Sequence, residues 1–275
     1  MFRLQESLSS AQNDHLQALR QWLSTPPGVC VAYSGGVDSA LVAAIAFEQQ
    51  GTRAFAVTGV SPALALHLLE EARHQARWIG IRHQECRTQE LQDLAYSSNP
   101  VDRCYACKRE LHRHLTQVVP NSGGALVVDG VNLDDLGDHR PGIQAAREAG
   151  VRSPLAELGI DKSTIRVLSK ALGFPWWDKP AQPCLASRFP YGETITAERL
   201  KRVGDAEALL ITNGFTRVRV RSQGLAARIE VPQNRIRDLL QLSEAGTLVP
   251  ELLSMGFTSV SLDLEGLVSG KLNRG

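Results

Sequence analysis

Two cysteines stand three residues apart in the stretch "VDRCYACKREL", at Cys104 and Cys107. Thiolates at this spacing, at the start of a helix, can bind one metal centre, but zinc sites, redox dithiols and chance also produce the pattern. The chain holds five cysteines, an odd number, and begins without the apolar core of a secretory signal. We therefore expect a cytoplasmic protein without a disulfide framework, in which Cys30 packs in the core between valines.

A second chemical pattern is the glycine loop in "VCVAYSGGVDSALVAA" (30–45). A short apolar run predicts a buried strand, and a helical pattern begins directly after Ser34-Gly35-Gly36-Val37-Asp38-Ser39. Two glycines allow unusual backbone conformations, and the amides at a helix start suit an anion. The lysine of a Walker A loop is absent. Asp38 is unfavourable beside a phosphate unless it orients the loop or holds magnesium.

This loop resembles the PP-loop of the N-type ATP pyrophosphatases, whose SGGxDS motif is complete here. The resemblance implies ATP binding by Ser34, Gly35, Gly36, Asp38 and Ser39, and cleavage of ATP between the α- and β-phosphates to form an adenylate. Adenine would lie at the end of the second strand, where Thr58 and Ser61 are candidates. Helix capping is the alternative role for both.

The elements around these motifs alternate along the first half of the chain. Apolar runs predict strands at 28–33, 53–59, 81–87 and 125–130, and helical patterns lie between them, including 61–78 with Ser61 as cap and a helix from the cysteine pair to about 119. The alternation predicts an open parallel sheet with helices on both faces. Later we expect a helix at 161–173, a proline-rich connector at 174–190, a helix at 196–213 and strands at 216–220, 226–231 and 257–264. We therefore predict an α/β domain (1–175) and a smaller C-terminal α+β domain (176–275).

Longer segments resemble the LarE family, the sulfur transferases that mature the nickel-pincer cofactor of lactate racemase. They are "DGVNLDDLGDHRPGIQAAREAGVRSPLAELGIDKSTIR", "WWDKPAQPCLASRFPYGETIT", "RVRV…AARIEV" and "LDLEG". The resemblance implies an enzyme acting on a pyridinium-3,5-dicarboxylate mononucleotide. Its carboxylates would be adenylylated by Mg-ATP and converted to thiocarboxylates. Sulfur would be delivered at the position of Cys184.

The family has two branches, in which the sulfur has different sources. In one branch the cysteine matching Cys184 gives up its own sulfur and becomes dehydroalanine. In the other, three cysteines hold a [4Fe–4S] cluster that carries a labile sulfide and is refilled by a sulfide donor. Because three thiolates leave one iron open, Cys104, Cys107 and Cys184 favour the cluster branch. A zinc site or a plain dithiol remains the alternative.

Several charged residues are candidates for the substrate site. Arg219 and Glu230 match the family's "RVR…RIE" pattern, and Arg217 and Arg221 alternate with Arg219 along the predicted strand. Arg188 and Glu207, near the reactive cysteine, are further candidates, and Lys108 is expected to reach an ATP phosphate. Asp129, Asn132, Asp135 and Arg140 follow the fourth strand at the active-site edge, with Asp129 or Asp135 as a further magnesium ligand. Solvated surface positions are the alternative for each. Relatives carry an arginine in a "GYRxGS"-like ending, whereas this chain reads "GLVSGKLN" with Val268 and Lys271. Lys271 is the candidate to replace that arginine, as a point charge. His67, His74 and His112 are expected at the surface.

Charge is balanced, with 30 basic and 29 acidic side chains. The absence of a basic surplus argues against nucleic acid as a partner, and no apolar run is long enough for a membrane span. A PP-loop tRNA thiolase nevertheless remains an alternative, as do an ammonia-using ligase and an ATP-binding regulator. We expect a small-molecule substrate and allow for a homo-oligomer.

Overall fold

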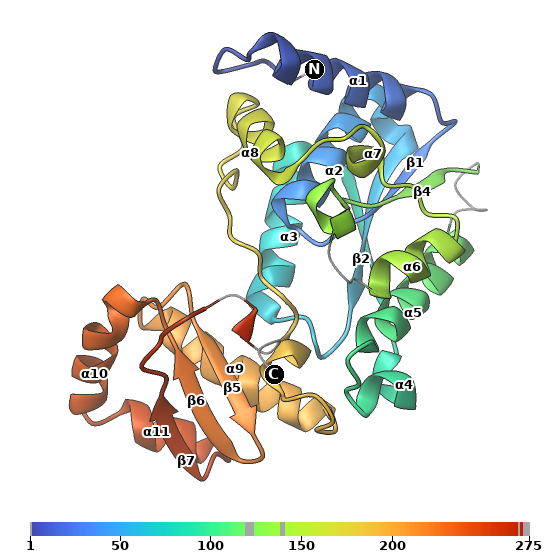
Figure 1. Ribbon diagram of the computed structural model, residues 1–275. Coiled ribbons are helices and arrows are strands. Elements are labelled where there is room, and N and C mark those ends of the chain that lie inside the picture. Colours follow the sequence, from blue (N-terminus) through green and yellow to red (C-terminus); the bar gives the residue numbers. More distant parts are fainter. Residues whose placement is uncertain (1, 119–123, 138–140, 269, 272–275) are drawn as a thin grey trace. The chain divides into compact units, whose positions relative to one another are not determined.

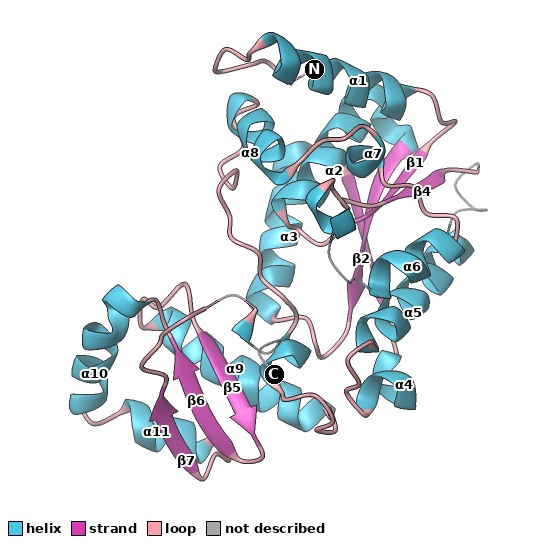
Figure 2. Cartoon of the chain, in the orientation of Figure 1, coloured by secondary structure: helices cyan, strands magenta, loops and turns pink. Residues whose placement is uncertain are grey.

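The apolar runs of the first half form a parallel four-stranded sheet in the order β3-β2-β1-β4 (Figures 1 and 2). The computed structural model describes residues 2–118, 124–137, 141–268 and 270–271. The elements up to the connector are α1 (Ser10–Ser24), β1 (Val29–Ala32), α2 (Val37–Gln50), β2 (Ala54–Val60), α3 (Leu66–Ile79), β3 (Arg82–Arg87), α4 (Leu94–Ser97), α5 (Arg103–Val118), β4 (Leu126–Val128), α6 (Pro141–Glu148), α7 (Pro154–Glu157) and α8 (Lys162–Ala171).

Both faces of this sheet are covered by helices, as predicted. Val29 and Val31 point to one face and pack with α1, α2, α3 and α8. Cys30 points to the other face, where Leu115 of α5 and Ala146 of α6 cover the sheet. Strand residues alternate between faces, so a continuous apolar run is what a sheet buried on both sides requires. Burial raises the pKa of the Cys30 thiol to about 12, which fits a core residue.

A second sheet in the order β5-β6-β7 lies in the C-terminal part of the chain. β5 and β6 are antiparallel, and β6 and β7 are parallel. The elements are the short 3-10 helix η5 (Leu185–Arg188), α9 (Ala197–Thr212), β5 (Arg219–Gln223), β6 (Ala226–Glu230), α10 (Ile236–Glu244), α11 (Leu248–Ser254) and β7 (Ser259–Leu262). This is the small α+β part that the sequence predicts, so the predicted fold class is confirmed.

The chain forms two compact units. The first comprises residues 1–61, 68–93 and 102–182, and the second comprises 62–67, 94–101 and 183–275. Two short segments of the N-terminal half thus belong to the second unit. The domain boundary expected between residues 175 and 176 stays a prediction.

Three local expectations are wrong. Helix α3 begins at Leu66 instead of Ser61. In the segment before it, the Ala63 carbonyl accepts a hydrogen bond from Leu185 N, 2.8 Å away. Strand β5 begins at Arg219, so Arg217 is exposed and outside the strand. His112 is buried in α5 with 1% exposure instead of lying at the surface.

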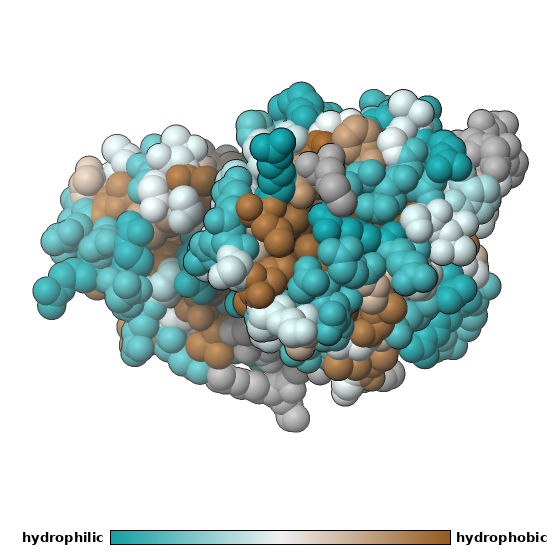
Figure 3. Space-filling model, turned by 90° about the horizontal axis from the view of Figure 1, so that it is seen from above, coloured by the Kyte–Doolittle hydropathy of each residue, from teal (hydrophilic) through white to brown (hydrophobic). Residues whose placement is uncertain are grey.

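No helix among the described residues is long and apolar enough to cross a membrane. On the face shown in Figure 3, hydrophilic residues predominate and apolar residues form smaller groups between them.

Candidate functional site

The glycine loop lies where the sequence places it, between β1 and the start of α2. Gly36 is the N-cap of α2 and has no side-chain capping bond. The Ser34 and Ser39 hydroxyls are 3.1 Å apart, and Ser34 Oγ accepts from Gly36 N at 3.3 Å. These bonds hold the loop compact at the positive end of the α2 dipole, which is where a phosphate group would be stabilised.

A glycine after β4 lets the end of this strand pack closely against the start of α2. A Cβ atom added at Gly130 would lie 2.6 Å from Ser39 N, a distance that real Cβ contacts do not reach. The end of β4 can therefore touch the first turn of α2 only with glycine at this position.

Asp38 is bound by a lysine that the sequence analysis does not single out. Lys162 Nζ, at the first residue of α8, is 2.6 Å from Oδ1 and 2.5 Å from Oδ2 of Asp38. Carboxylate oxygens suit magnesium, so Asp38 fits the expected donor type, but a metal ion there has to exchange with Lys162. A second such lysine, Lys179, donates to the Gly35 carbonyl at 3.2 Å.

The two adenine candidates lie at the end of β2 and directly after it. The Thr58 hydroxyl is buried, donates to the Tyr33 carbonyl at 2.7 Å and lies 2.8 Å from His83 Nε2. Burial lowers the pKa of His83. Ser61 is half-buried after β2 and does not cap α3. Adenine binding by Thr58 and Ser61 stays a prediction.

The polar residues after β4 form a turn of their own. Asp129 accepts from Val131 N at 3.1 Å and from Ser153 Oγ at 2.8 Å. The Asn132 side chain accepts from two backbone amides, those of Asp134 and Asp135. Burial raises the pKa of Asp129, and the charge of Lys108 on α5 opposes that rise. Lys108 is therefore close enough to act on a residue at the carboxyl end of β4. Its expected contact with an ATP phosphate stays a prediction, and Arg140 lies outside the described residues.

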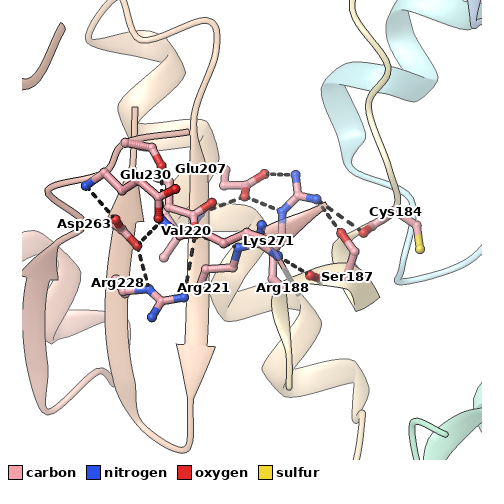
Figure 4. Close-up of polar contacts among 12 residues, drawn as sticks. Cys184, Ser187, Arg188, Glu207, Val220, Arg221, Arg228, Glu230, Asp263 and Lys271 are labelled. Atoms are coloured by element: carbon pink, nitrogen blue, oxygen red, sulfur yellow. Dashed lines mark hydrogen bonds and ion pairs between the residues drawn. The ribbon is translucent and has the colours of Figure 1, made fainter. Parts of the chain in front are cut away.

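The cysteine pair lies in the first two turns of α5. Cys104 is exposed and Cys107 half-buried, and their spacing puts them on one side of the helix. Cys184 is exposed at the N-cap of η5, with its thiol pointing away from the nearby charged network (Figure 4). The pair belongs to the first unit and Cys184 to the second. Within the residues that the structure describes, no three His, Cys, Asp or Glu side chains form a group that could hold a metal ion.

A network of paired charges lies beside Cys184 in the second unit (Figure 4). Glu207 of α9 accepts from Arg188 Nε at 2.7 Å and Nη2 at 3.0 Å, and from Val220 N at 2.9 Å. Arg188 also donates to the Pro183 carbonyl at 3.1 Å, directly before Cys184. The network thus holds the backbone that carries the thiol.

The second half of this network joins β5 and β6. Arg221 Nε donates to Glu230 Oε1 at 3.1 Å, and Arg221 Nη1 donates to the Ser187 carbonyl at 2.6 Å. Arg219 is half-buried on the same face of β5. Burial and the charges of Arg188 and Arg221 lower its pKa. Of the predicted residues, Arg188, Glu207, Arg219 and Glu230 are therefore brought together.

Lys271, the candidate replacement for the family's arginine, lies among carboxylates of the second unit, and its role in the site stays a prediction. Lys271 Nζ lies 2.7 Å from Asp263 and 3.2 Å from Glu265, and the hydrogen bond to Asp263 helps raise the pKa of Lys271 against its desolvation. Asp263 also faces Arg228 at 3.4 Å. The positive charge of Lys271 is thus already balanced by its own neighbours.

Taken together, these features define a two-unit α/β protein with a glycine loop suited to a phosphate group and an arginine-rich face beside an exposed thiol.

No family model matches the chain. An uncharacterized protein from Synechocystis is 53% identical over 94% of this chain and 97% of its own length. The pyridinium-3,5-bisthiocarboxylic acid mononucleotide synthase of Lactiplantibacillus plantarum is 37% identical over 89% of this chain and 88% of its own length. An uncharacterized protein from Methanocaldococcus jannaschii is 28% identical over 86% of this chain and 89% of its own length. The chain belongs to the LarE family, that of the synthase.

Proposed function

We propose that this protein is an ATP-dependent sulfur transferase that converts the carboxylates of a pyridinium-3,5-dicarboxylate mononucleotide to thiocarboxylates, in the biosynthesis of the nickel-pincer cofactor. The observation that carries the proposal is the 37% identity, over 89% of the chain, with a bisthiocarboxylic acid mononucleotide synthase. The intact SGGVDS loop at the start of α2 supports the use of ATP.

The first half-reaction activates a carboxylate. A carboxylate oxygen attacks the α-phosphorus of ATP, the bond to the bridging oxygen breaks, and pyrophosphate leaves with that electron pair. The amides at the start of α2 and the Ser34 and Ser39 hydroxyls would bind the departing phosphates. Magnesium would neutralise phosphate charge, with Asp38 as its protein ligand once Lys162 has moved to a phosphate.

Arg219 is the residue best placed to bind an anionic group of the substrate. Arg188 and Arg221 already have carboxylate partners, Glu207 and Glu230, whereas Arg219 forms no ion pair with any described residue. A guanidinium matches phosphate or carboxylate with two parallel hydrogen bonds. Glu207 and Glu230 would hold the arginines in place while the substrate is bound.

The second half-reaction replaces AMP by sulfur. A sulfur nucleophile adds to the acyl-adenylate carbonyl, and AMP leaves with the electron pair of the C–O bond. A [4Fe–4S] cluster, when bound, would supply an iron-held sulfide. Cys104, Cys107 and Cys184 fit such a cluster in kind, because they are three thiols, two of them exposed, and leave one iron open. Loss of sulfur from Cys184 itself is the alternative.

The main test supplies the mononucleotide, Mg-ATP and sulfide to anaerobically purified protein. We expect one pyrophosphate and one AMP for each oxygen exchanged for sulfur, with the product followed by mass spectrometry. Absence of substrate-dependent pyrophosphate release contradicts the proposal. If tRNA binds with a steep salt dependence and the mononucleotide is inert, the tRNA thiolase alternative is correct.

A second measurement separates the two sulfur sources. Iron and acid-labile sulfide are measured in the wild type and in Cys104→Ala, and the peptide that contains Cys184 is weighed before and after one turnover. The cluster route predicts iron in the wild type only and an unchanged Cys184. Colourless wild-type protein with dehydroalanine at position 184 after turnover shows the sacrificial route.

A further inference from the structure

The peptide between Gly35 and Gly36 is held on both of its sides. Its carbonyl, that of Gly35, accepts from Lys179 Nζ at 3.2 Å, and its amide, that of Gly36, donates to Ser34 Oγ at 3.3 Å. Gly35 has φ +68°, in the left-handed region, and an added Cβ would come 2.9 Å from the Cβ of Ala72. The loop is thus pressed against α3 in one orientation.

Lys179 is itself held in place. Its ammonium pairs with Glu71 of α3, the helix that also supplies Ala72, and its side chain is only 14% exposed. Its backbone amide donates to the Trp176 carbonyl at 3.0 Å. Both ends of this side chain are therefore fixed, and the ammonium is presented to the loop carbonyl at a defined position.

The orientation of this peptide matters for an anion. A carbonyl oxygen carries partial negative charge and repels phosphate, while amide hydrogens attract it. A peptide flanked by two glycines meets little steric resistance to rotation. A bound cation at the carbonyl favours the orientation in which that oxygen points away from the anion.

We propose that Lys179 is a positioning residue of the glycine loop. With Glu71 it holds the Gly35–Gly36 peptide with its carbonyl on the ammonium, so that this oxygen does not face a polyphosphate bound at the start of α2. The inference rests on the proposed function only for the identity of that ligand. The competing role is direct contact of Lys179 with phosphate.

Two other lysines of the first unit also form ion pairs and help to define controls for the substitution of Lys179. Lys170 pairs with Glu6 at 3.0 Å on the surface of α8, so Lys170→Met removes a lysine–glutamate pair away from the loop. Lys162 pairs with the side chain of Asp38 instead of holding a backbone carbonyl of the glycine loop within the described part of the chain. Lys170→Met is therefore the matched control for Lys179→Met, and Glu71→Gln keeps the lysine while removing its partner.

The first measurement uses the ligand-free protein. Hydrogen exchange is followed in the peptide that spans residues 34–40, and the Gly35 and Gly36 amide signals are followed by NMR. Lys179→Met should raise amide exchange in this segment about tenfold, the effect expected for the loss of one charge-assisted hydrogen bond. Glu71→Gln should act in the same direction but less, and Lys170→Met should have no effect.

The second measurement is the affinity for inorganic pyrophosphate and for Mg-ATP by calorimetry. Lys179→Met should weaken both about tenfold, and Lys179→Arg, which keeps a cationic donor, should recover part of the loss. Unchanged loop exchange in ligand-free Lys179→Met overturns the proposal, and a loss of affinity without that change identifies a direct phosphate ligand. If Lys179→Met does not fold, the same two measurements, loop amide exchange and ligand affinity, are made on Glu71→Gln and test the proposal in its place. If the wild type binds neither probe while loop exchange still responds, the proposed ATP chemistry fails and the positioning role stands.

Discussion

Arg219 and Glu230 are register partners across β5 and β6, yet no hydrogen bond or ion pair joins them in the described part of the chain. Glu230 Oε1 accepts from Arg221, and its Oε2 is buried without a hydrogen-bond partner. Arg219 is half-buried, and burial and two neighbouring arginines lower its pKa. A half-buried guanidinium beside two other arginines lowers the stability of the folded state. An anionic ligand bound to Arg219 would offset this loss of stability.

Replacing Arg219 should therefore affect binding more than stability. For Arg219→Met we expect the KM of the mononucleotide to rise at least about tenfold, because a charge-assisted contact is lost. The free energy of unfolding should stay level or rise, since repulsion from Arg188 and Arg221 is relieved. Steady-state kinetics and urea unfolding measure the two quantities. Arg217→Met, exposed before the strand, is the control, and an unchanged KM for Arg219→Met removes Arg219 from the site.

Replacing Glu207 should mainly reduce stability. Its side chain is 3% exposed, and the carboxylate accepts two bonds from Arg188 and one from the Val220 amide. Glu207→Gln leaves the Arg188 charge buried without a counter-ion, which costs about 3–5 kcal/mol. Urea unfolding should show this loss, while Glu198→Gln, whose exposed carboxylate pairs with Arg202, should shift stability by less than about 1 kcal/mol. Equal urea-unfolding midpoints for Glu207→Gln and wild type would contradict the role of Glu207 as the counter-ion that stabilises buried Arg188.

The parts of the fold that sequence predicts are those set by local patterns. Strand β3 and helix α9 fall within a residue or two of the expected positions, because apolar periodicity and capping residues act over a few positions. Thr196, for example, caps α9 by accepting from Arg199 N. The glycine loop is likewise local, so its place between β1 and α2 follows from sequence.

The features that the sequence does not predict depend on contacts between residues that are distant along the chain. The segment before helix α3, where the sequence predicts a helix, is bonded through the Ala63 carbonyl to Leu185, more than a hundred positions away. Lys162 reaches Asp38 across 124 positions, and Lys179 reaches Gly35 across 144. No sequence pattern near either lysine indicates a contact with the glycine loop, so these contacts are found only in the folded structure. The surface position expected for His112 is wrong because a polar residue type says little about the face of α5 on which the residue lies.

Asn99 should prove important for the second unit. It is fully buried, has φ 56°, and is the only described residue other than glycine with positive φ. Its Nδ2 donates to the Pro190 carbonyl at 2.7 Å, and its own carbonyl accepts from Gly192 N at 2.9 Å. Segment 94–101 is thereby joined to the chain that follows η5.

Two substitutions at Asn99 separate backbone strain from the side-chain bond. Asn99→Gly tolerates the positive φ but removes one of the two donors to the Pro190 carbonyl, which keeps the Glu193 amide at 3.2 Å, so the expected cost is that of one hydrogen bond, about 0.5–1.5 kcal/mol. Asn99→Ala adds the left-handed penalty of about 1–2 kcal/mol. Denaturant unfolding should therefore rank wild type above Asn99→Gly and Asn99→Gly above Asn99→Ala. If alanine and glycine are equally stable, backbone strain at this position is not significant.

His112 should make the protein sensitive to acid. Burial, reinforced by the charge of Lys108 one turn earlier, lowers its pKa from 6.5 to about 4, and neither ring nitrogen has a hydrogen-bond partner among the described residues. In the unfolded chain the imidazole takes up a proton below about pH 6.5, whereas the folded protein resists it until about pH 4. Stability contributed by this group is therefore complete above pH 6.5 and falls as the pH decreases, by about 3 kcal/mol in total.

Because other groups titrate in the same range, the decisive quantity is the difference between wild type and His112→Leu. An apolar side chain of similar size leaves no buried polar atom unpaired, so we expect the variant to match or exceed the wild type at pH 7. Urea unfolding between pH 7 and 4 should show that the free energy of unfolding of the variant, relative to that of the wild type, increases as the pH falls. His74→Leu, exposed on α3, should follow the wild-type curve, and parallel curves for wild type and His112→Leu would mean that His112 is protonated as easily in the folded protein as in the unfolded chain.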